Sequence, residues 1–231
     1  MIDPVERERE AIAYLDSWPW ERGGTLIGGY ALAAYGSPRF SVDLDLVLTA
    51  RQYNEIRPIL AAERSTLLRL PNIAGTNPPR VERLQLGLVT VDLMIDGVVD
   101  RLAQVVVEPE WVGRDAIREV LSLRTGRTSA AVSVARIEAL WALKLLAGRD
   151  QDLADLLALS DRQIRVAEIR AFLAEHPNSG LTKRTNLLKE KLASPKTYLD
   201  TISRLSRGRP SHPSNRAVWN RFVALVEGSL P

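Results

Sequence analysis

Residues 40–48 constrain the fold most, because their polarity alternates from one residue to the next. In the stretch FSVDLDLVL the apolar Val42, Leu44 and Leu46, expected on one face, alternate with Asp43 and Asp45. Successive strand side chains point to opposite faces of a sheet, so this alternation predicts a half-buried β-strand with both carboxylates on one face, about 6.5–7 Å apart. Buried carboxylates are costly unless their charge is compensated, and a divalent cation is the simplest compensation.

Length and composition restrict the class of protein. The chain has 231 residues, of which 45% are hydrophobic and 26% charged, and this excludes a disordered or fibrous protein. It has no cysteine, which excludes disulfides, zinc–thiolate sites and cysteine nucleophiles. The N-terminal residues are charged, and no apolar run approaches about 18 residues. We therefore expect no signal peptide, no membrane contact and a cytoplasmic location.

The patterning changes near residue 125. We expect an α+β, or mixed α/β, domain over residues 1–125, with a small mixed sheet and flanking helices, followed by an all-helical C-terminal domain over residues 126–231. The expected strands are 25–27, 40–48 and one within 84–95, with further segments near 105–107 and 130–134; the expected helices are 5–16, 30–35, 51–63, about 134–148 after an N-cap at Ser133, 151–159, 161–175, 181–193, 196–205 and 214–227.

The net charge of +3 is the sum of an acidic N-terminal part and a basic C-terminal part of the chain. Residues 1–125 hold 14 Lys+Arg and 18 Asp+Glu, whereas residues 126–231 hold 17 and 10. Between Leu181 and Arg221 there are ten basic and two acidic residues. This segment has the charge to hold a polyanion, and a solvated helical face is the alternative.

A third carboxylate is expected on a later strand. Asp92 lies mid-strand on the polar face of 84–95, and Asp96 shares that face but sits at the strand end. Divalent cations held by such carboxylates clamp the attacking and leaving oxygens in phosphoryl transfer. Asp92 is therefore the better candidate to complete the site and to help deprotonate an attacking hydroxyl.

Residues before the strand are suited to a phosphate. Gly28 and Gly29 follow a short apolar strand and open a helix, which leaves free backbone N–H groups with no Cβ in the way. Arg39 stands at the turn that leads into the strand, and Ser41 shares the face of Asp43. Both side chains are able to contact an anionic oxygen.

The stretch LIGGYALAAYGSPRFSVDLDLVL closely resembles the signature of the polymerase-β-like nucleotidyltransferase superfamily. That signature combines Gly-Gly or Gly-Ser at a helix start, an Arg-x-(Ser/Thr)-x-Asp-x-Asp strand and a later third acid. The resemblance implies transfer of a nucleoside monophosphate from an NTP, such as ATP, to an acceptor hydroxyl with Mg²⁺ or Mn²⁺. It assigns the metal to Asp43, Asp45 and Asp92, and the triphosphate to Gly28, Gly29, Arg39 and Ser41.

Residues 137–159 resemble one particular family within this superfamily. Their sequence, IEALWALKLLAGRDQDLADLLAL, resembles the Lys-x-x-Ala-x-Arg-x-x-Asp-x-x-Asp helix of AbiEii-type nucleotidyltransferases, toxins of type IV toxin–antitoxin pairs. Lys144, Arg149, Asp152 and Asp155 fill its positions. The family implies a catalytic, triphosphate-binding role for Lys144, a nucleotide-binding role for Asp152, a tRNA 3′ end as acceptor and a cognate antitoxin as partner.

Other interpretations remain open from the sequence. Lys144 is alternatively a surface lysine, Asp152 an N-cap and Asp155 part of a solvated face. The acceptor is alternatively a small molecule, as in aminoglycoside modification, or a protein hydroxyl. A catalytically silent nucleotide-binding regulator is the rival from another functional class.

Overall fold

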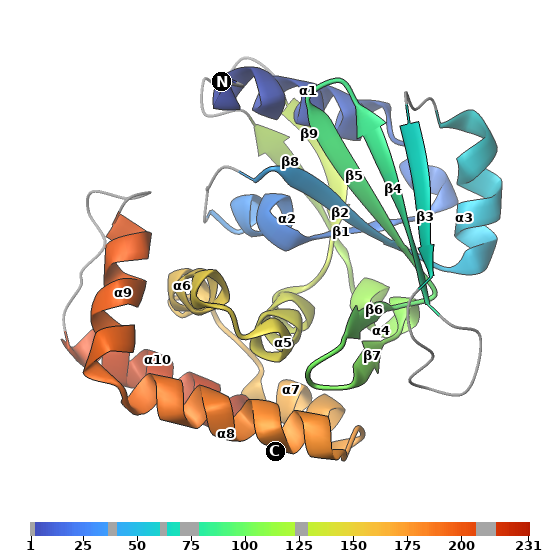
Figure 1. Cartoon of the computed structure of the whole chain (residues 1–231). Coiled ribbons are helices and arrows are strands. Elements are labelled where there is room, and N and C mark those ends of the chain that lie inside the picture. Colours follow the sequence, from blue (N-terminus) through green and yellow to red (C-terminus); the bar gives the residue numbers. More distant parts are fainter. Residues whose placement is uncertain (1–2, 37–40, 61–63, 70–78, 123–128, 207–215) are drawn as a thin grey trace. The chain divides into compact units, whose positions relative to one another are not determined.

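The computed structural model describes residues 3–36, 41–60, 64–69, 79–122, 129–206 and 216–231 (Figure 1). The chain divides into two compact units. Unit 1 comprises Met1–Val99 and Val106–Arg136, and unit 2 comprises Asp100–Val105 and Ile137–Pro231. Unit 1 contains a mixed seven-stranded sheet with flanking helices, and the long part of unit 2 is helical, so the expected α+β fold class is confirmed.

Strands and helices occur in the following order along the described residues. The strands are β1 (Thr25–Ile27), β2 (Asp43–Leu48), β3 (Arg64–Arg69), β4 (Arg80–Leu86), β5 (Val89–Ile95), β6 (Val98–Asp100), β7 (Val105–Val107), β8 (Ile117–Ser122) and β9 (Ser129–Val134). The α-helices are α1 (Pro4–Ser17), α2 (Gly28–Ala34), α3 (Ala50–Ile56), α4 (Pro109–Gly113), α5 (Ile137–Ala147), α6 (Asp150–Leu159), α7 (Val166–Ala174), α8 (Ser179–Ala193), α9 (Pro195–Ser206) and α10 (Arg216–Ser229).

The sheet of unit 1 has the order β3-β4-β5-β2-β1-β9-β8. At its centre β2 pairs parallel with β5 and antiparallel with β1. The two parallel strands bury one face completely, because six aliphatic side chains in direct register there have no exposed surface. These are Leu44, Leu46 and Leu48 of β2 and Val91, Leu93 and Ile95 of β5. The polar residues that alternate with them therefore lie on the opposite face.

Two details of the sequence expectations differ from the structure. Ser133 is not an N-cap: it lies in β9, where it pairs with Arg118 of β8, and α5 begins only at Ile137. Val42, expected on the apolar face, precedes β2 and is 62% exposed. β9 also pairs with β1, and the compact unit that contains the sheet extends to Arg136.

Unit 2 is built around α5, whose side chains are almost all buried. Trp141 has no exposed surface, and its ring meets the Phe222 ring of α10 edge to face with centroids 6.5 Å apart. Gly148 separates α5 from α6 by adopting φ +55°, a left-handed value that suits a residue without Cβ. Within the described residues, each helix is too short or too polar to act as a membrane-spanning segment.

Candidate active site

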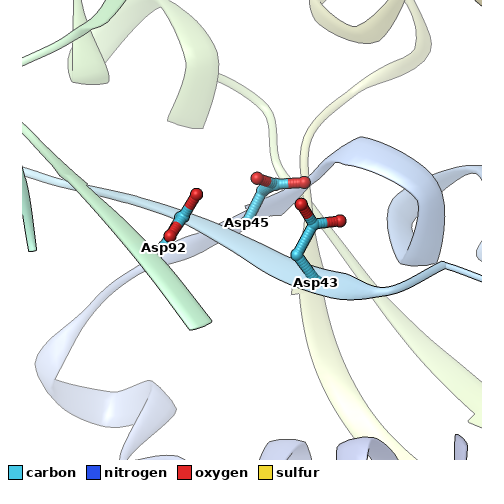
Figure 2. A group of neighbouring side chains, drawn as sticks. All are labelled: Asp43, Asp45 and Asp92. Atoms are coloured by element: carbon cyan, nitrogen blue, oxygen red, sulfur yellow. The ribbon is translucent and has the colours of Figure 1, made fainter. Parts of the chain in front are cut away.

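Three carboxylates converge on the polar face of the two central parallel strands. Asp43 and Asp45 project from β2, and Asp92 of β5 lies directly beside Asp45 in the strand register. Carboxylate oxygens from all three lie within 4.8 Å of one another, and Figure 2 shows the three groups pointing to the same side. Asp43 and Asp45 are half-buried, whereas Asp92 is only 7% exposed. We call Asp43, Asp45 and Asp92 the carboxylate cluster.

Arg83 of β4 holds the carboxylate of Asp92 from the neighbouring strand. Its Nε donates to Oδ1 at 2.7 Å and its Nη2 to Oδ2 at 2.6 Å, a two-pronged geometry that fixes the carboxylate plane. These hydrogen bonds, together with the charges of Asp92, Asp43 and Asp45, raise the pKa of Arg83. Arg83 was not among the residues predicted from the sequence. The signal lies in the tight turn at Gly87, which places residues 83 and 92 opposite each other.

The glycine turn lies against the cluster. Gly28, the first residue of α2, has φ +71°, and a Cβ built at this position would collide with the carboxylate of Asp45. Ile27 of β1 pairs with Asp45 of β2, which explains this proximity. Gly29 is buried in the first turn of the same helix. The close approach of backbone and carboxylate therefore depends on a glycine at position 28.

Ser41, Arg39 and Asp96, the other residues considered for this site, differ in where they lie. Ser41 is buried and donates to Oδ1 of Asp43 at 3.3 Å, so it belongs beside the cluster. Arg39 lies outside the described residues. Asp96 is used elsewhere, because its Oδ1 accepts a hydrogen bond from the backbone N–H of Ala50 at 2.6 Å, at the start of α3.

A second charged group lies in unit 2. Nζ of Lys144 is 2.9 Å from Oδ1 of Asp152 and 2.8 Å from Oδ2 of Asp155, and all three side chains are buried. Nε of Arg149 also contacts Asp152, at 2.7 Å. Lys144 comes from α5 and the two acids from α6, so the turn at Gly148 brings them together rather than one continuous helix. The four charged residues of the AbiEii-type motif therefore form ion pairs with one another in the structure.

Asp152 is ionised because its cations outweigh its burial. Burial by itself would raise the pKa of this carboxyl group. Hydrogen bonds from Arg149 and the charge and hydrogen bond of Lys144 act in the opposite direction, and the net effect is a lowered pKa. Sequence reasoning predicted these residue types at one site but not that Lys144 would be shared between Asp152 and Asp155.

The carboxylate cluster fits a divalent cation of the Mg²⁺ type. Its donors are carboxylate oxygens, the ligands that Mg²⁺ and Mn²⁺ prefer, and they converge from two strands. Three carboxylates at this separation repel one another, and Arg83 offsets part of this repulsion through its ion pair with Asp92. A divalent cation would therefore find both its ligand type and a favourable electrostatic field here.

A glycine turn beside three carboxylates on the central strands of a mixed sheet is the arrangement that the sequence resemblance implies for a nucleotidyltransferase. A comparison with protein-family models matches residues 19–228 to the family described as "Nucleotidyl transferase AbiEii toxin, Type IV TA system". The match covers nearly the whole chain, so the chain belongs to the AbiEii family of nucleotidyltransferase toxins. Membership implies an NTP substrate and a cognate antitoxin. A search of the curated proteins gives no match.

Proposed function

We propose that the protein transfers a nucleoside monophosphate from an NTP to the 3′-terminal hydroxyl of a tRNA, with release of pyrophosphate, in the cytoplasm. The observation that carries this proposal is the convergence of Asp43, Asp45 and Asp92 within 4.8 Å. In phosphoryl transfer the protein mainly positions the reacting groups and offsets charge, and a carboxylate cluster beside a glycine turn is suited to that task.

Asp43, Asp45 and Asp92 are the residues that would hold Mg²⁺ or Mn²⁺. When bound, the cation supplies positive charge that offsets the negative charge growing on the phosphates as pyrophosphate leaves. The chain's own contribution is to fix the three carboxylates. Asp45 packs against the backbone of Gly28, and Asp43 accepts a hydrogen bond from Ser41. Asp92 accepts hydrogen bonds from Arg83.

The triphosphate is proposed to bind next to this cluster. Gly28 and Gly29 present backbone N–H groups at the start of α2, and Ser41 offers a hydroxyl beside Asp43. Arg39 adds a positive charge in the sequence between the turn and the strand. These groups would orient the α-phosphorus for attack by the acceptor hydroxyl.

Asp92 is proposed to accept the proton of that hydroxyl. Each of its oxygens accepts one hydrogen bond from Arg83 and has a second lone-pair position that can take the proton. Arg83 would keep the side chain in place during this step.

Lys144 and Asp152 are proposed as the contribution of unit 2 to nucleotide binding. Nζ of Lys144 lies between Asp152 and Asp155 in the structure, so a phosphate that binds Lys144 would replace one of these carboxylates as its partner. A buried lysine with two acidic partners is held in one position, which reduces the entropy lost on binding.

The excess of basic residues in the C-terminal part supports an RNA acceptor over a small molecule. Lys183 and Lys189 are exposed on α8, whereas Lys191 is paired with Asp150 at 3.0 Å. Exposed lysines contribute to RNA affinity by displacing counterions from phosphates.

The test is a labelling assay with the purified protein, Mg²⁺ and each ribonucleoside triphosphate in labelled form. The acceptors compared are purified tRNA, total RNA, an aminoglycoside and no acceptor. We expect label in tRNA with the native protein and with Asp16→Asn, an exposed aspartate of α1, but not with Asp43→Asn.

The other outcomes decide against the proposal. Label that enters the aminoglycoside or the protein itself, but not RNA, would establish one of the alternative acceptors. No label in any acceptor, together with NTP binding, would indicate a silent nucleotide-binding regulator. Transfer that survives Asp43→Asn would remove the carboxylate cluster from the mechanism.

A further inference from the structure

A hollow of about 420 Å³ lies at the N-terminal end of α8, within unit 2. Its walls come from the first turns of α8 and from the segment Asp100–Val105. This volume is in the range of pockets that hold small ligands. The hollow lies in unit 2, whereas the carboxylate cluster belongs to unit 1. We call it the α8 hollow.

The two walls of the α8 hollow are joined by specific contacts. Asn178 caps α8 by accepting from the backbone N–H of Leu181 at 2.8 Å, and its amide donates to the carbonyl of Gln104 at 3.2 Å. A Cβ at Gly180 would lie 2.7 Å from the carbonyl oxygen of Ala103, so the backbones approach as closely as a glycine permits. Asp100 also accepts from the backbone N–H of Ala103 at 2.6 Å. The hollow is therefore a built feature with ordered walls.

Arg184 is a buried cation for which the described residues provide no anionic partner. Arg184 is among the residues that line the hollow, it is only 6% exposed, and its buried Nε has no hydrogen-bond partner among the described residues. Its Nη1 lies against the turn between α5 and α6, since a Cβ at Gly148 would be 2.9 Å from it. No described residue forms an ion pair with it either. A buried guanidinium that lacks an acceptor costs free energy, so this arrangement is explained if an anion occupies the hollow when the protein functions.

The other charges of the α8 hollow have the same sign. Arg101 and Lys183 line it together with Arg184, and none of its lining residues is acidic. Ser179 and Gly180, the first residues of a 15-residue helix, also face it. The N-terminal end of a helix favours negative charge through its free N–H groups and its dipole. Three cations and a helix N-terminus attract an anion and repel a cation.

We propose that the α8 hollow binds a phosphate group. Guanidinium groups, a lysine and helical N–H groups are the donors that phosphate oxygens accept from in proteins. The phosphate belongs to an RNA strand or to a nucleotide. An adjoining hollow shares Ser179, Lys183 and Leu187 with the first and gives room for a longer ligand, an RNA strand. The phosphate of that strand would lie in the first hollow, because Glu190 lines the second. The choice of an RNA strand rests on the proposed function, whereas phosphate binding itself does not.

The first test measures thermal unfolding of the full-length protein with and without inorganic phosphate or pyrophosphate, at constant ionic strength. A ligand that binds only the folded state raises the unfolding midpoint. We expect this rise in the native protein and in Arg170→Gln, which removes an exposed charge of α7 outside the hollow. We expect it to be lost in Lys183→Gln and in Arg101→Gln. An equal rise in all four proteins, or no rise in the native protein, would overturn the proposal.

The second test separates function from folding. If Arg184 is kept for an anion, Arg184→Met removes an unpaired buried charge, so without phosphate its unfolding midpoint is equal to or above that of the native protein. With phosphate the variant gains nothing. An unfolding midpoint below the native value in the absence of phosphate would assign Arg184 to the fold and contradict the proposal.

The third test distinguishes the two sources of phosphate. Binding of a short RNA that ends in a 3′-deoxy nucleotide, and of a non-hydrolysable NTP analogue, is measured for Lys183→Gln and Arg170→Gln. Loss of one charge-assisted hydrogen bond weakens binding about tenfold. We expect this loss for Lys183→Gln with RNA; a loss with the NTP analogue instead would assign the phosphate to a nucleotide, and a loss with neither would overturn the proposal.

The stabilisation by phosphate is expected to be independent of the proposed nucleotide transfer. Asp43→Asn is expected to abolish nucleotide transfer and to keep the stabilisation by phosphate, because Asp43 belongs to unit 1 and does not line the hollow. Loss of transfer with retained stabilisation therefore reports on the carboxylate cluster. Retained transfer with absent stabilisation would reject the phosphate site alone.

Discussion

Arg83 and Asp92 show how neighbouring strands can hold a charged side chain at a fixed angle. Asp92 is nearly buried, whereas the Arg83 side chain is 52% exposed, so the pair lies at the edge of the solvent. Such a guanidinium offsets one of the three carboxylate charges while it leaves the cluster accessible. It also keeps Asp92 oriented when no metal ion is bound.

We predict that Arg83→Met lowers the free energy of unfolding by about 1–2 kcal/mol in the absence of divalent cations, because a nearly buried carboxylate loses both hydrogen bonds. Mg²⁺ is expected to stabilise the variant more than the native protein, since the metal then replaces the missing charge. Urea unfolding with EDTA and with Mg²⁺ measures both effects.

The control for this prediction is the same change in an Asp92→Asn background, where most of the cost of Arg83→Met should disappear. An equal cost in both backgrounds would show that Arg83 stabilises the fold through contacts other than Asp92. An equal effect of Mg²⁺ on Arg83→Met and on the native protein would contradict the electrostatic argument.

Asp152 gives the structure a pH dependence whose sign is defined. Burial opposes ionisation, but Arg149 and Lys144 outweigh it, so the pKa of Asp152 is lower in the folded than in the unfolded chain. The resulting stabilisation is fully present above the unfolded pKa of about 3.9 and is lost as the pH falls through the lower, folded pKa.

We predict that acidification below about pH 4 lowers the free energy of unfolding of the native protein more steeply than that of Asp152→Asn, which has no carboxylate to protonate. At neutral pH the variant is the less stable of the two, because Lys144 and Arg149 lose their charged partner. Urea unfolding at a series of pH values tests this, and two parallel pH profiles would contradict it.

At the scale of single residues, the sequence predicted which carboxylates share a face of the sheet, but it did not predict which side chains they contact. The alternation around Asp43 and Asp45 was sufficient to place both carboxylates on one face, and the polar face of the later strand was sufficient to choose Asp92. Arg83 depends on strand register, which a single strand pattern does not contain. Arg184 had a usable signal: it falls on the helical stripe of Leu181, Leu188 and Leu192, where a charge is unexpected.

At the scale of elements, four strands of the described residues were not predicted: β3 and β8, which are the edges of the seven-stranded sheet, and also β4 and β6, since one strand alone was expected within 84–95. β3 and β8 occupy the two ends of the strand order. Their sequences, RSTLLR and IREVLS, carry charged residues and lack an uninterrupted apolar alternation. Edge strands commonly carry charges that prevent pairing with other chains, so their pattern is weaker than that of central strands. β1, β2 and β5 are central and were predicted.

The junction between β1 and α2 provides a test at this scale. We predict that Gly28→Ala lowers the free energy of unfolding by at least about 1 kcal/mol, because an alanine at φ +71° is strained and its Cβ meets the carboxylate of Asp45. Nucleotide transfer should fall as well, since Asp45 has to move. Urea unfolding and the labelling assay measure the two effects.

Gly29→Ala is the matched control for stability. Gly29 is also in the first turn of α2 but does not have a positive φ, so alanine there avoids the backbone strain. An equal loss of stability in Gly28→Ala and Gly29→Ala would show that the strain argument is wrong.

At the scale of the whole molecule, the small net charge of +3 is the sum of an acidic and a basic part. The acidic part contains the carboxylate cluster, and the basic part contains α8 and the residues that follow it. A metal ion on the first and RNA phosphates on the second would reduce the excess charge of both. The carboxylates and the basic residues of α8 thus belong to different units.

We predict that RNA affinity falls by about tenfold or more between roughly 50 and 200 mM monovalent salt, because several lysine and arginine contacts to phosphates release counterions on binding. The affinity should decrease with the same slope in Asp43→Asn, which leaves the basic residues intact. Fluorescence anisotropy with a labelled tRNA measures it. An affinity independent of salt would contradict a role of the basic residues in holding RNA.

The path of the chain through the two units has a consequence for synthesis on the ribosome. The hydrogen bond between Asn178 and Gln104 joins residues 74 positions apart, so residues 100–105 leave the ribosome long before α8 exists. Domains fold progressively as the chain emerges. The part of Asp100–Val105 that contacts α8 therefore lacks this partner until the helix is translated. A truncated chain that ends before residue 178 can complete the sheet and its carboxylates, but it has no α8 hollow.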